Sequence, residues 1–394
     1  MAVAVLAACG ASSGPPATVN YKGSVLHLGA VLSLTGAGGS IGQEQQKAIA
    51  LAVDQLNNTG GVAGAKVSID VVDDGSDQQQ GVQVTQDLIQ AKKVLGIIGP
   101  SLANTALLAD PAAQKLKTPV ILPSVTGSGL VGQCGQPCDY IFRDSLGETA
   151  AIPANVKAAT ARTHPHTAAL FYAIDDKASA DGAATFQQAF ADNGVALPTG
   201  GVQSFAKTET AFTTYVASAL ALKADIWAVS AQGAVPAALI AEARTQGFKG
   251  PILGGNGFNS YAVSMHAGVA GKGAASASAY YAGIDSSANK QFVAAYSAKY
   301  KDTAGKAILP GAVAAQAYAA VLLFAEGGRR ARLAFGDRAA DRTRLRDALA
   351  GGWTTDTPMG NLGFTPEHDV RQPIYIVAMD GKGGFDLLAT TSPG

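Results

Sequence analysis

Apolar runs typical of strands alternate with helical patterns along most of the chain. A short apolar run at 25–32 precedes a segment at 41–56 whose apolar residues recur at helical spacing. The alternation continues with expected strands at 67–72, 94–98 and 119–122 and expected helices at 78–90 and 103–115. Strands that alternate with helices build βαβ units, so this half of the chain predicts a parallel sheet covered by helices on both faces.

The same rhythm restarts after residue 144. The second set comprises expected helices at 148–162, 180–192, 212–222 and 235–246 and expected strands at 168–172, 201–205, 225–230 and 251–254. The tail adds two helices, at 288–301 and 312–326, and a hairpin at 374–388. We therefore expect an α/β protein with two doubly wound parallel-sheet units in tandem, whose sheets the tail returns to complete.

Composition narrows the class of protein. The 394 residues match two domains of the usual ~100–200 residues each. Hydrophobic residues make up 47% of the chain, which excludes a disordered protein. The 29 Lys and Arg balance 29 Asp and Glu, whereas a nucleic-acid binder normally carries a basic excess, so we expect no nucleic-acid partner. No run reaches the ~18–20 apolar residues of a membrane span.

The first residues predict export and lipid attachment. A short apolar run ends in Leu6-Ala7-Ala8-Cys9, which resembles a bacterial lipobox, and small polar residues follow at 11–18. We interpret residues 1–23 as a signal peptide with lipobox and tether, with Cys9 as the lipidated residue. This places the protein outside the cytoplasm, held at the membrane by lipid alone. The alternative is an apolar N-terminus with a chance cysteine, since no Lys or Arg precedes the run.

The other two cysteines predict a small disulfide. Cys134 and Cys138 are separated by Gly135, Gln136 and Pro137, a spacing that permits the close approach a disulfide needs in an exported protein. Free thiols are the alternative. A metal site would need two further thiolates or histidines nearby, and the histidines are scattered, so we expect no metal.

The chain lacks the common sequence motifs of α/β enzymes. The glycine-rich turn at 36–42 sits where a dinucleotide fingerprint would, but Ile41 occupies the position of its third glycine. The chain contains neither a phosphate-binding loop of the G-x-x-x-x-G-K-[ST] type nor a G-x-S-x-G nucleophile elbow. We therefore expect no cofactor and no enzymatic activity, and an α/β enzyme remains the least favoured reading.

Two loops at the carboxyl ends of successive strands favour ligand binding. The loops at 99–105 and 123–129 are rich in Ser, Thr and Gly and lead out of strands, at the edge where open α/β sheets bind ligands. Free backbone N–H groups at a helix start favour an anion such as a carboxylate. The alternative is simple N-capping by Ser101 or Asn104.

Several short motifs, in order along the chain, resemble one known family. They are Leu34-Thr35-Gly36, Asn57-Asn58-Thr59-Gly60-Gly61, Val71-Val72-Asp73-Asp74, Gly96-Ile97-Ile98-Gly99-Pro100 and Tyr140-Ile141-Phe142-Arg143. Their order and spacing are similar to those of the leucine/isoleucine/valine-binding family of substrate-binding proteins for bacterial ABC importers. The resemblance runs from about residue 26 to 388, nearly the whole mature chain.

The resemblance implies a type I periplasmic binding protein fold, in which two lobes joined by three crossovers close around a ligand. The implied crossovers lie near 142–144, 280–284 and 359–364. Lobe I would comprise residues 24–144 and 285–357, and lobe II residues 145–284 and 358–394.

The resemblance also implies a set of ligand-binding residues on the two lobes. On lobe I these are Ile41, Ser101, Leu102, Ala103, Asn104, Ser124, Val125 and Thr126, and on lobe II they are Ser179, Gln232 and Asn256. Asn256 stands where the family has an acid that pairs with the ammonium of an amino acid, and Asn supplies no charge. Because a buried ammonium without a carboxylate is costly, an amide or an organic acid fits as well as an amino acid, unless Asp175 or Asp176 reaches the pocket.

The resemblance finally implies a role in transport. We expect a monomer that captures a small polar solute and delivers it to an ABC permease. The alternative is a sensor that reports the ligand to a membrane receptor.

An arginine-rich segment lies outside these motifs. Residues 327–347 contain Arg329, Arg330, Arg332, Arg338, Arg342, Arg344 and Arg346. Two interpretations stay open: a solvated loop followed by a helix start, or a contact surface for a permease or anionic lipid.

Overall fold

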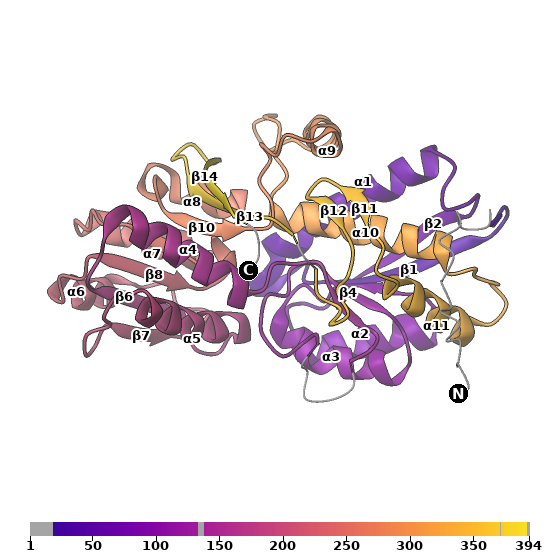
Figure 1. Ribbon diagram of the computed structural model, residues 1–394, viewed down its shortest axis with the longest axis horizontal. Helices are drawn as coiled ribbons and strands as arrows, with labels where there is room; N and C mark the ends of the chain where they lie inside the picture. Colours follow the sequence, from indigo (N-terminus) through magenta and orange to yellow (C-terminus); the bar gives the residue numbers. More distant parts are fainter. Residues whose placement is uncertain (1–18, 133–137, 371, 392–394) are drawn as a thin grey trace, which may run out of the picture.

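The structure is a computed structural model that describes residues 19–132, 138–370 and 372–391. It contains two α/β lobes that lie next to each other along the longest axis of the molecule (Figure 1). Cys9, Cys134 and the predicted tether up to residue 18 lie outside the described residues. In the part of the chain that is described, no helix is both long and apolar enough to cross a membrane.

The first lobe is built on a five-stranded parallel sheet with the order β2-β1-β3-β4-β5. Its strands are β1 (Val25–Leu32), β2 (Lys66–Asp73), β3 (Ile97–Ile98), β4 (Val120–Leu122) and β5 (Ile141–Arg143). Three helices connect them: α1 (Gly39–Asn58), α2 (Gln78–Gln90) and α3 (Ala103–Lys115). The last five residues of β1 are all buried, as expected for a strand covered on both faces.

The second lobe is built on a seven-stranded sheet with the order β14-β13-β10-β9-β8-β6-β7. Its parallel strands are β6 (Ala168–Ala173), β7 (Val202–Phe205), β8 (Ile226–Ser230), β9 (Ile252–Gly254) and β10 (Ala275–Ser278). The antiparallel pair β13 (Ile374–Met379) and β14 (Phe385–Thr391) is added at one edge. The helices are α4 (Glu148–Thr163), α5 (Lys177–Asp192), α6 (Thr213–Ala221), α7 (Val235–Thr245) and α8 (Tyr261–Gly271).

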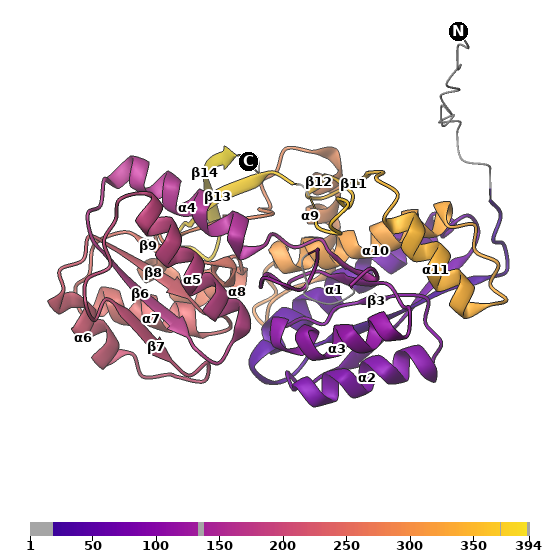
Figure 2. The same ribbon diagram turned by 60° about the horizontal axis from the view of Figure 1, so that its bottom comes forward.

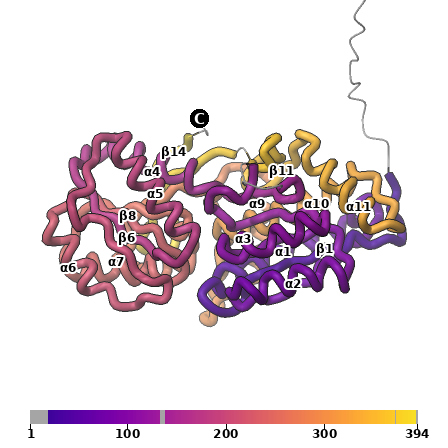
Figure 3. Tube along the Cα trace, turned by 90° about the horizontal axis from the view of Figure 1, so that it is seen from below, coloured from indigo at the N-terminus to yellow at the C-terminus, as the bar shows by residue number. Residues whose placement is uncertain are grey.

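The chain passes between the lobes three times. It leaves the first sheet after β5, and it returns after β10 with α9 (Ser287–Lys299), α10 (Ala312–Arg330) and α11 (Arg338–Leu349). Figures 2 and 3 show these late helices beside the N-terminal elements of the first lobe, where α10 packs against α1. After the small hairpin of β11 (Thr355–Thr357) and β12 (Gly360–Leu362), the chain crosses again to form β13.

The small hairpin of β11 and β12 lies at the third predicted crossover, 359–364. In this segment, Met359 and Leu362 are fully buried in an apolar cluster that contains residues of α1 and α10 and also of β10 and β13. The burial of these two residues holds the hairpin in place where the chain passes between the lobes for the third time.

The α/β architecture with two doubly wound lobes is confirmed, and the missed elements have local causes. Strand β10 reads Ala-Ser-Ala-Ser and has none of the β-branched or aromatic residues that predict a strand. Helix α8 is interrupted at Gly268, whose backbone is not helical. Helix α11 falls in the arginine-rich segment and is held by Leu345 and Leu349, which lie in the core.

Candidate functional site

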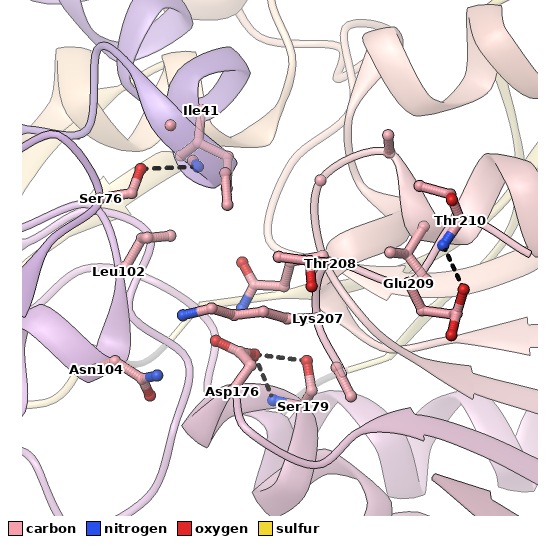
Figure 4. Close-up of a pocket in the computed structure, with 18 of the residues that line it drawn as sticks. Ile41, Ser76, Leu102, Asn104, Asp176, Ser179, Lys207, Thr208, Glu209 and Thr210 are labelled. Atoms are coloured by element: carbon pink, nitrogen blue, oxygen red, sulfur yellow. Dashed lines mark hydrogen bonds between the residues drawn. The ribbon is translucent and has the colours of Figure 1, made fainter. Parts of the chain in front are cut away.

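A cavity of about 520 Å³ lies between the lobes (Figure 4). Its wall comprises Gly36, Ala37, Gly38, Ile41, Ser76, Gln78, Leu102 and Asn104 from the first lobe, and Ala173, Asp176, Ser179, Lys207, Thr208, Glu209, Thr210, Gln232, Gly233, Ala234, Val235 and Ala238 from the second. These segments follow the carboxyl ends of β1, β2 and β3 and of β6, β7 and β8. The cavity therefore occupies the position where parallel α/β sheets bind ligands.

A much smaller chamber, of about 40 Å³, lies next to this cavity. Ser124, Thr126 and Asn256 line it, and it shares Ile41 and Gln232 with the larger cavity. The two spaces together form an interlobe site with one roomy part and one narrow polar part.

Most of the expected ligand-binding residues line one of these two spaces. Ile41, Leu102, Asn104, Ser179 and Gln232 line the large cavity, and Ser124, Thr126 and Asn256 line the small chamber. Ser101, Ala103 and Val125 line neither and are buried. The Ser101 hydroxyl donates a hydrogen bond to Gln45 Oε1 and accepts one from the Ser33 N–H, so it faces the protein interior.

The hydroxyl groups of the small chamber bind neighbouring protein atoms. Ser124 Oγ donates to the Ser101 carbonyl at 2.7 Å and accepts from Gln45 Nε2 at 2.7 Å. Thr126 Oγ1 donates to Glu148 Oε1 at 3.3 Å. The hydroxyl protons of Ser124 and Thr126 therefore already have acceptors inside the protein.

Glu148 is a residue of this region that sequence reasoning missed. Its side chain is buried beside the small chamber, and Oε1 accepts a hydrogen bond from the Asn256 N–H at 3.1 Å. Burial raises the pKa of the Glu148 carboxyl from its ordinary 4.5 to about 7, although hydrogen bonds from Asn256 and Thr126 act in the opposite direction. A carboxyl group therefore does lie next to Asn256. It comes from the first turn of α4, so the residues around position 256 in the sequence give no sign of it.

The large cavity also carries charged groups. Asp176 reaches it, as the sequence left open, and its Oδ2 accepts hydrogen bonds from the N–H and hydroxyl of Ser179 at the start of α5. Lys207 and Glu209 line it too, on the irregular segment between β7 and α6. No periodicity or motif marks that segment, so the sequence offered no signal for these two residues.

Hydrogen bonds between the lobes hold the cleft closed. Asn104 Nδ2 donates to the Asp175 carbonyl at 3.1 Å, and Asn104 Oδ1 accepts from the Lys177 N–H at 2.7 Å. The Ser128 N–H and hydroxyl both donate to Asp181 Oδ2 on the opposite lobe. Helix α3 has no side-chain cap, so neither Ser101 nor Asn104 acts as the simple N-cap that the sequence allowed.

The arginine-rich segment is largely engaged in contacts within the first lobe. Arg342 is buried and donates to the carbonyls of Val94 and Ile89. Ion pairs join Arg329 and Arg330 to Glu326, Arg344 to Asp341 and Arg346 to Asp347. These contacts favour the structural interpretation of the segment over a dedicated docking surface.

Only one of the two cysteines of the predicted disulfide lies among the described residues. Cys138 is disulfide-bonded, but Cys134 lies outside the described residues, so the pairing of these two cysteines stays a prediction. Among the described residues, no group of three or more His, Cys, Asp and Glu side chains is placed to hold a metal ion.

The chain is similar in sequence to known binding proteins. A family model described as periplasmic binding protein matches residues 25–384. The leucine-, isoleucine-, valine-, threonine-, and alanine-binding protein of Pseudomonas aeruginosa is 26% identical over 345 residues, which cover 86% of this chain and 85% of that protein.

Solved structures of similar fold include transporter proteins with different ligands. The branched-chain amino acid transporter substrate-binding protein LivJ of Streptococcus pneumoniae, in complex with isoleucine, superposes with a TM-score of 0.81 at 22% identity, covering 94% of this chain and 99% of that one. A solute-binding protein of an ABC transporter from R. palustris, in complex with benzoate, also reaches a TM-score of 0.81 at 22% identity, covering 94% and 97% of the two chains.

Proposed function

This chain belongs to the periplasmic binding protein family, and we propose that it captures a small polar solute in the closed cleft described above and delivers it to an ABC permease. Family membership makes it a solute-binding protein rather than an enzyme and implies a location outside the cytoplasm. The observation that supports the cleft as the binding site is a cavity of about 520 Å³ with walls from both lobes. Such a cavity can bury most of the surface of a small ligand, and pre-aligned polar groups then give specificity without a covalent step.

The ligand we propose is an amino acid or a related amide or organic acid. A relative of similar length is named for amino-acid binding, and proteins of the same fold bind isoleucine or benzoate. The wall of this cavity combines apolar side chains such as Ile41, Leu102 and Val235 with a few charged groups. That mixture suits a molecule with an apolar body and one charged end.

The finer features predicted from the sequence belong to the same proposal. Residues 24–144 and 285–357 would form lobe I, and residues 145–284 and 358–394 lobe II. The protein would act as a monomer, tethered to the bacterial membrane through a lipid on Cys9. The lobes then close on a bound solute by a hinge motion of the three crossovers.

Calorimetric titration tests the binding function directly. Trp227 is fully buried and stacks on Phe248 in the core of the second lobe, so tryptophan fluorescence is a poor reporter of the cleft. We expect at least one of isoleucine, benzoate and 4-hydroxybenzoate to bind at one site per chain without being converted. Ile41→Trp, which fills space in both parts of the site, should abolish that binding.

The matched control is Val269→Trp, because Val269 is 84% exposed and lines neither part of the site. Equal loss of binding in both variants, or full binding by Ile41→Trp, would place the ligand elsewhere. Transport assays with the permease then separate delivery from sensing, since a sensor would bind the solute and leave its uptake unchanged.

A further inference from the structure

Lys207 brings a positive charge into the large cavity. Its side chain is half-buried, and Figure 4 shows it extending from the segment after β7 toward Leu102 on the first lobe. The Lys207 ammonium forms no ion pair or hydrogen bond with any residue that the structure describes. Lys177, which lies near the cavity at the start of α5, is by contrast paired with Asp181 at 2.8 Å.

The two carboxylates of the cavity wall already have donors of their own. Asp176 Oδ2 accepts from the N–H and hydroxyl of Ser179. Glu209 Oε1 accepts from the N–H groups of Thr210 and Ala211, both at 2.8 Å. Hydrogen bonds from N–H and O–H groups stabilise these negative charges locally, whereas the Lys207 ammonium has no such compensation.

The starts of four helices add positive potential at the same place. The residues that precede α1, α3, α5 and α7 all line the cavity: they are Gly38, Leu102, Asp176 and Ala234. Only α5 has a side-chain cap among these four, so the first N–H groups of the other three are left without a capping side chain. Helix N-termini carry partial positive charge and favour anions.

The narrow chamber is the less suitable place for a ligand carboxylate. It measures only about 40 Å³, and the hydroxyl protons of Ser124 and Thr126 are bound to Ser101 and Glu148. The side-chain amide of Asn256 likewise donates to the Leu146 carbonyl at 3.0 Å. The Lys207 ammonium and the larger volume both belong to the other cavity.

From these observations we infer that the ligand is an organic anion with an apolar body, whose charged group pairs with Lys207 in the larger cavity. Lys207 is then the residue that selects an acid over its uncharged amide. Ile41, Leu102 and Val235 contact the apolar body. The inference rests on the proposed function, because it names the ligand class of the same cleft. An ion pair inside a closed cleft also explains why an unpaired ammonium is tolerated there: the ligand supplies the missing charge.

The test compares acids with their amides on matched lysine variants. Thermal shift and calorimetry would use three pairs: benzoate and benzamide, 4-hydroxybenzoate and 4-hydroxybenzamide, and isoleucine and isoleucinamide. We expect the wild-type protein to bind the acid of at least one pair more than tenfold tighter than the amide. Lys207→Gln should lose this preference at least tenfold, and Lys207→Arg should retain most of it.

Lys249→Gln is the control, because Lys249 is exposed and lines neither part of the site. An unchanged melting temperature of ligand-free Lys207→Gln shows that this variant is folded. The inference is overturned if Lys207→Gln keeps the wild-type preference for the acid, or if amides bind as well as acids to the wild type; either result leaves solute binding intact. If no compound binds to any of the proteins, the ligand class of the proposed function falls together with the inference.

Discussion

At the scale of single residues, three hydroxyl groups in and beside the narrow chamber are engaged by neighbours that come from elsewhere in the chain. Gln45 of α1 reaches Ser101 and Ser124, and Glu148 of α4 reaches Thr126. The neutral Asn256 is therefore accompanied by an acid after all, since its N–H donates to Glu148. Whether this carboxyl is charged depends on pH, because its pKa of about 7 lies close to neutrality.

Glu148 predicts that the protein becomes less stable as the pH rises. The folded protein keeps the Glu148 proton up to a pH of about 7, whereas the unfolded chain releases it near 4.5, so between these values the folded state binds more protons. A pKa difference of this size between the folded and unfolded states corresponds to roughly 3 kcal/mol. The unfolding free energy should decrease by this amount as the pH rises from 4.5 through about 7. Urea unfolding between pH 5 and 8 measures this decline.

Glu148→Gln isolates the contribution of this one carboxyl. Gln cannot ionise, so the unfolding free energy of the variant should fall less steeply with pH than that of the wild type. Asp192→Asn is a suitable control, because Asp192 is an exposed carboxylate at the end of α5. Parallel pH profiles for wild type and Glu148→Gln would show that the carboxyl is not buried in its neutral form.

At the scale of elements, close packing of helix α1 against the end of β1 sets the shape of the site. Gly42 lies in the first turn of α1, and a Cβ atom there would lie 2.1 Å from the Ser33 carbonyl oxygen. The same turn carries Ile41, which lines both parts of the site. The glycine is needed for this approach of helix to strand, whereas its neighbour Ile41 shapes the cavity.

Gly42→Ala should therefore destabilise the protein and weaken ligand binding together. Overpacking of this kind typically lowers the unfolding free energy by about 1–3 kcal/mol, and the shift of α1 also moves Ile41. Gly336→Ala is the matched control, because nothing lies within 4 Å of a Cβ at that position. Urea unfolding and calorimetry measure the two effects, and a Gly42→Ala protein as stable as Gly336→Ala would contradict the packing argument.

At the scale of the whole molecule, direct hydrogen bonds between the lobes favour the closed form over the open one. Asn104 binds both the Asp175 carbonyl and the Lys177 N–H, and Ser128 binds Asp181. The zero formal net charge provides no general attraction for a charged solute, so charge selection must come from local groups such as Lys207. Closure and recognition are thus both controlled by side chains that follow the strands.

Asn104→Ala should shift the protein toward an open form. Two hydrogen bonds of about 1 kcal/mol each would be lost, which corresponds to a change of roughly thirtyfold in the ratio of closed to open molecules. Small-angle X-ray scattering of the ligand-free protein should show a larger radius of gyration, and calorimetry a weaker affinity. Asn58→Ala, at an exposed position near the end of α1, should change neither quantity. A compact, tightly binding Asn104→Ala protein would show that Asn104 does not hold the lobes together.

The order of strands and helices could be predicted from the sequence because the signal for each element is local. The predicted bounds of α2 and α3 coincide with those observed, since apolar spacing and turn residues mark both ends of these helices. The Ala-Ser-Ala-Ser strand β10 has no such signal and owes its place to the neighbours β9 and β13. The local pattern of apolar residues therefore predicted the α/β class, whereas β10 forms because it pairs with the strands on either side of it.

The sequence by itself also indicated most of the loops that line the interlobe cavity, because the loops after parallel strands must meet at one edge of a sheet. Only the tertiary structure decided which side chains face the cavity: Lys207 and Glu209 reach it, whereas Ser101 and Val125 face inward. The direction of a loop side chain depends on partners that are distant in sequence, as Gln45 shows for Ser101, 56 residues away. Residue spacing in the sequence shows where a loop lies along the chain. Which of its polar side chains face the cavity is decided only when both lobes fold and close.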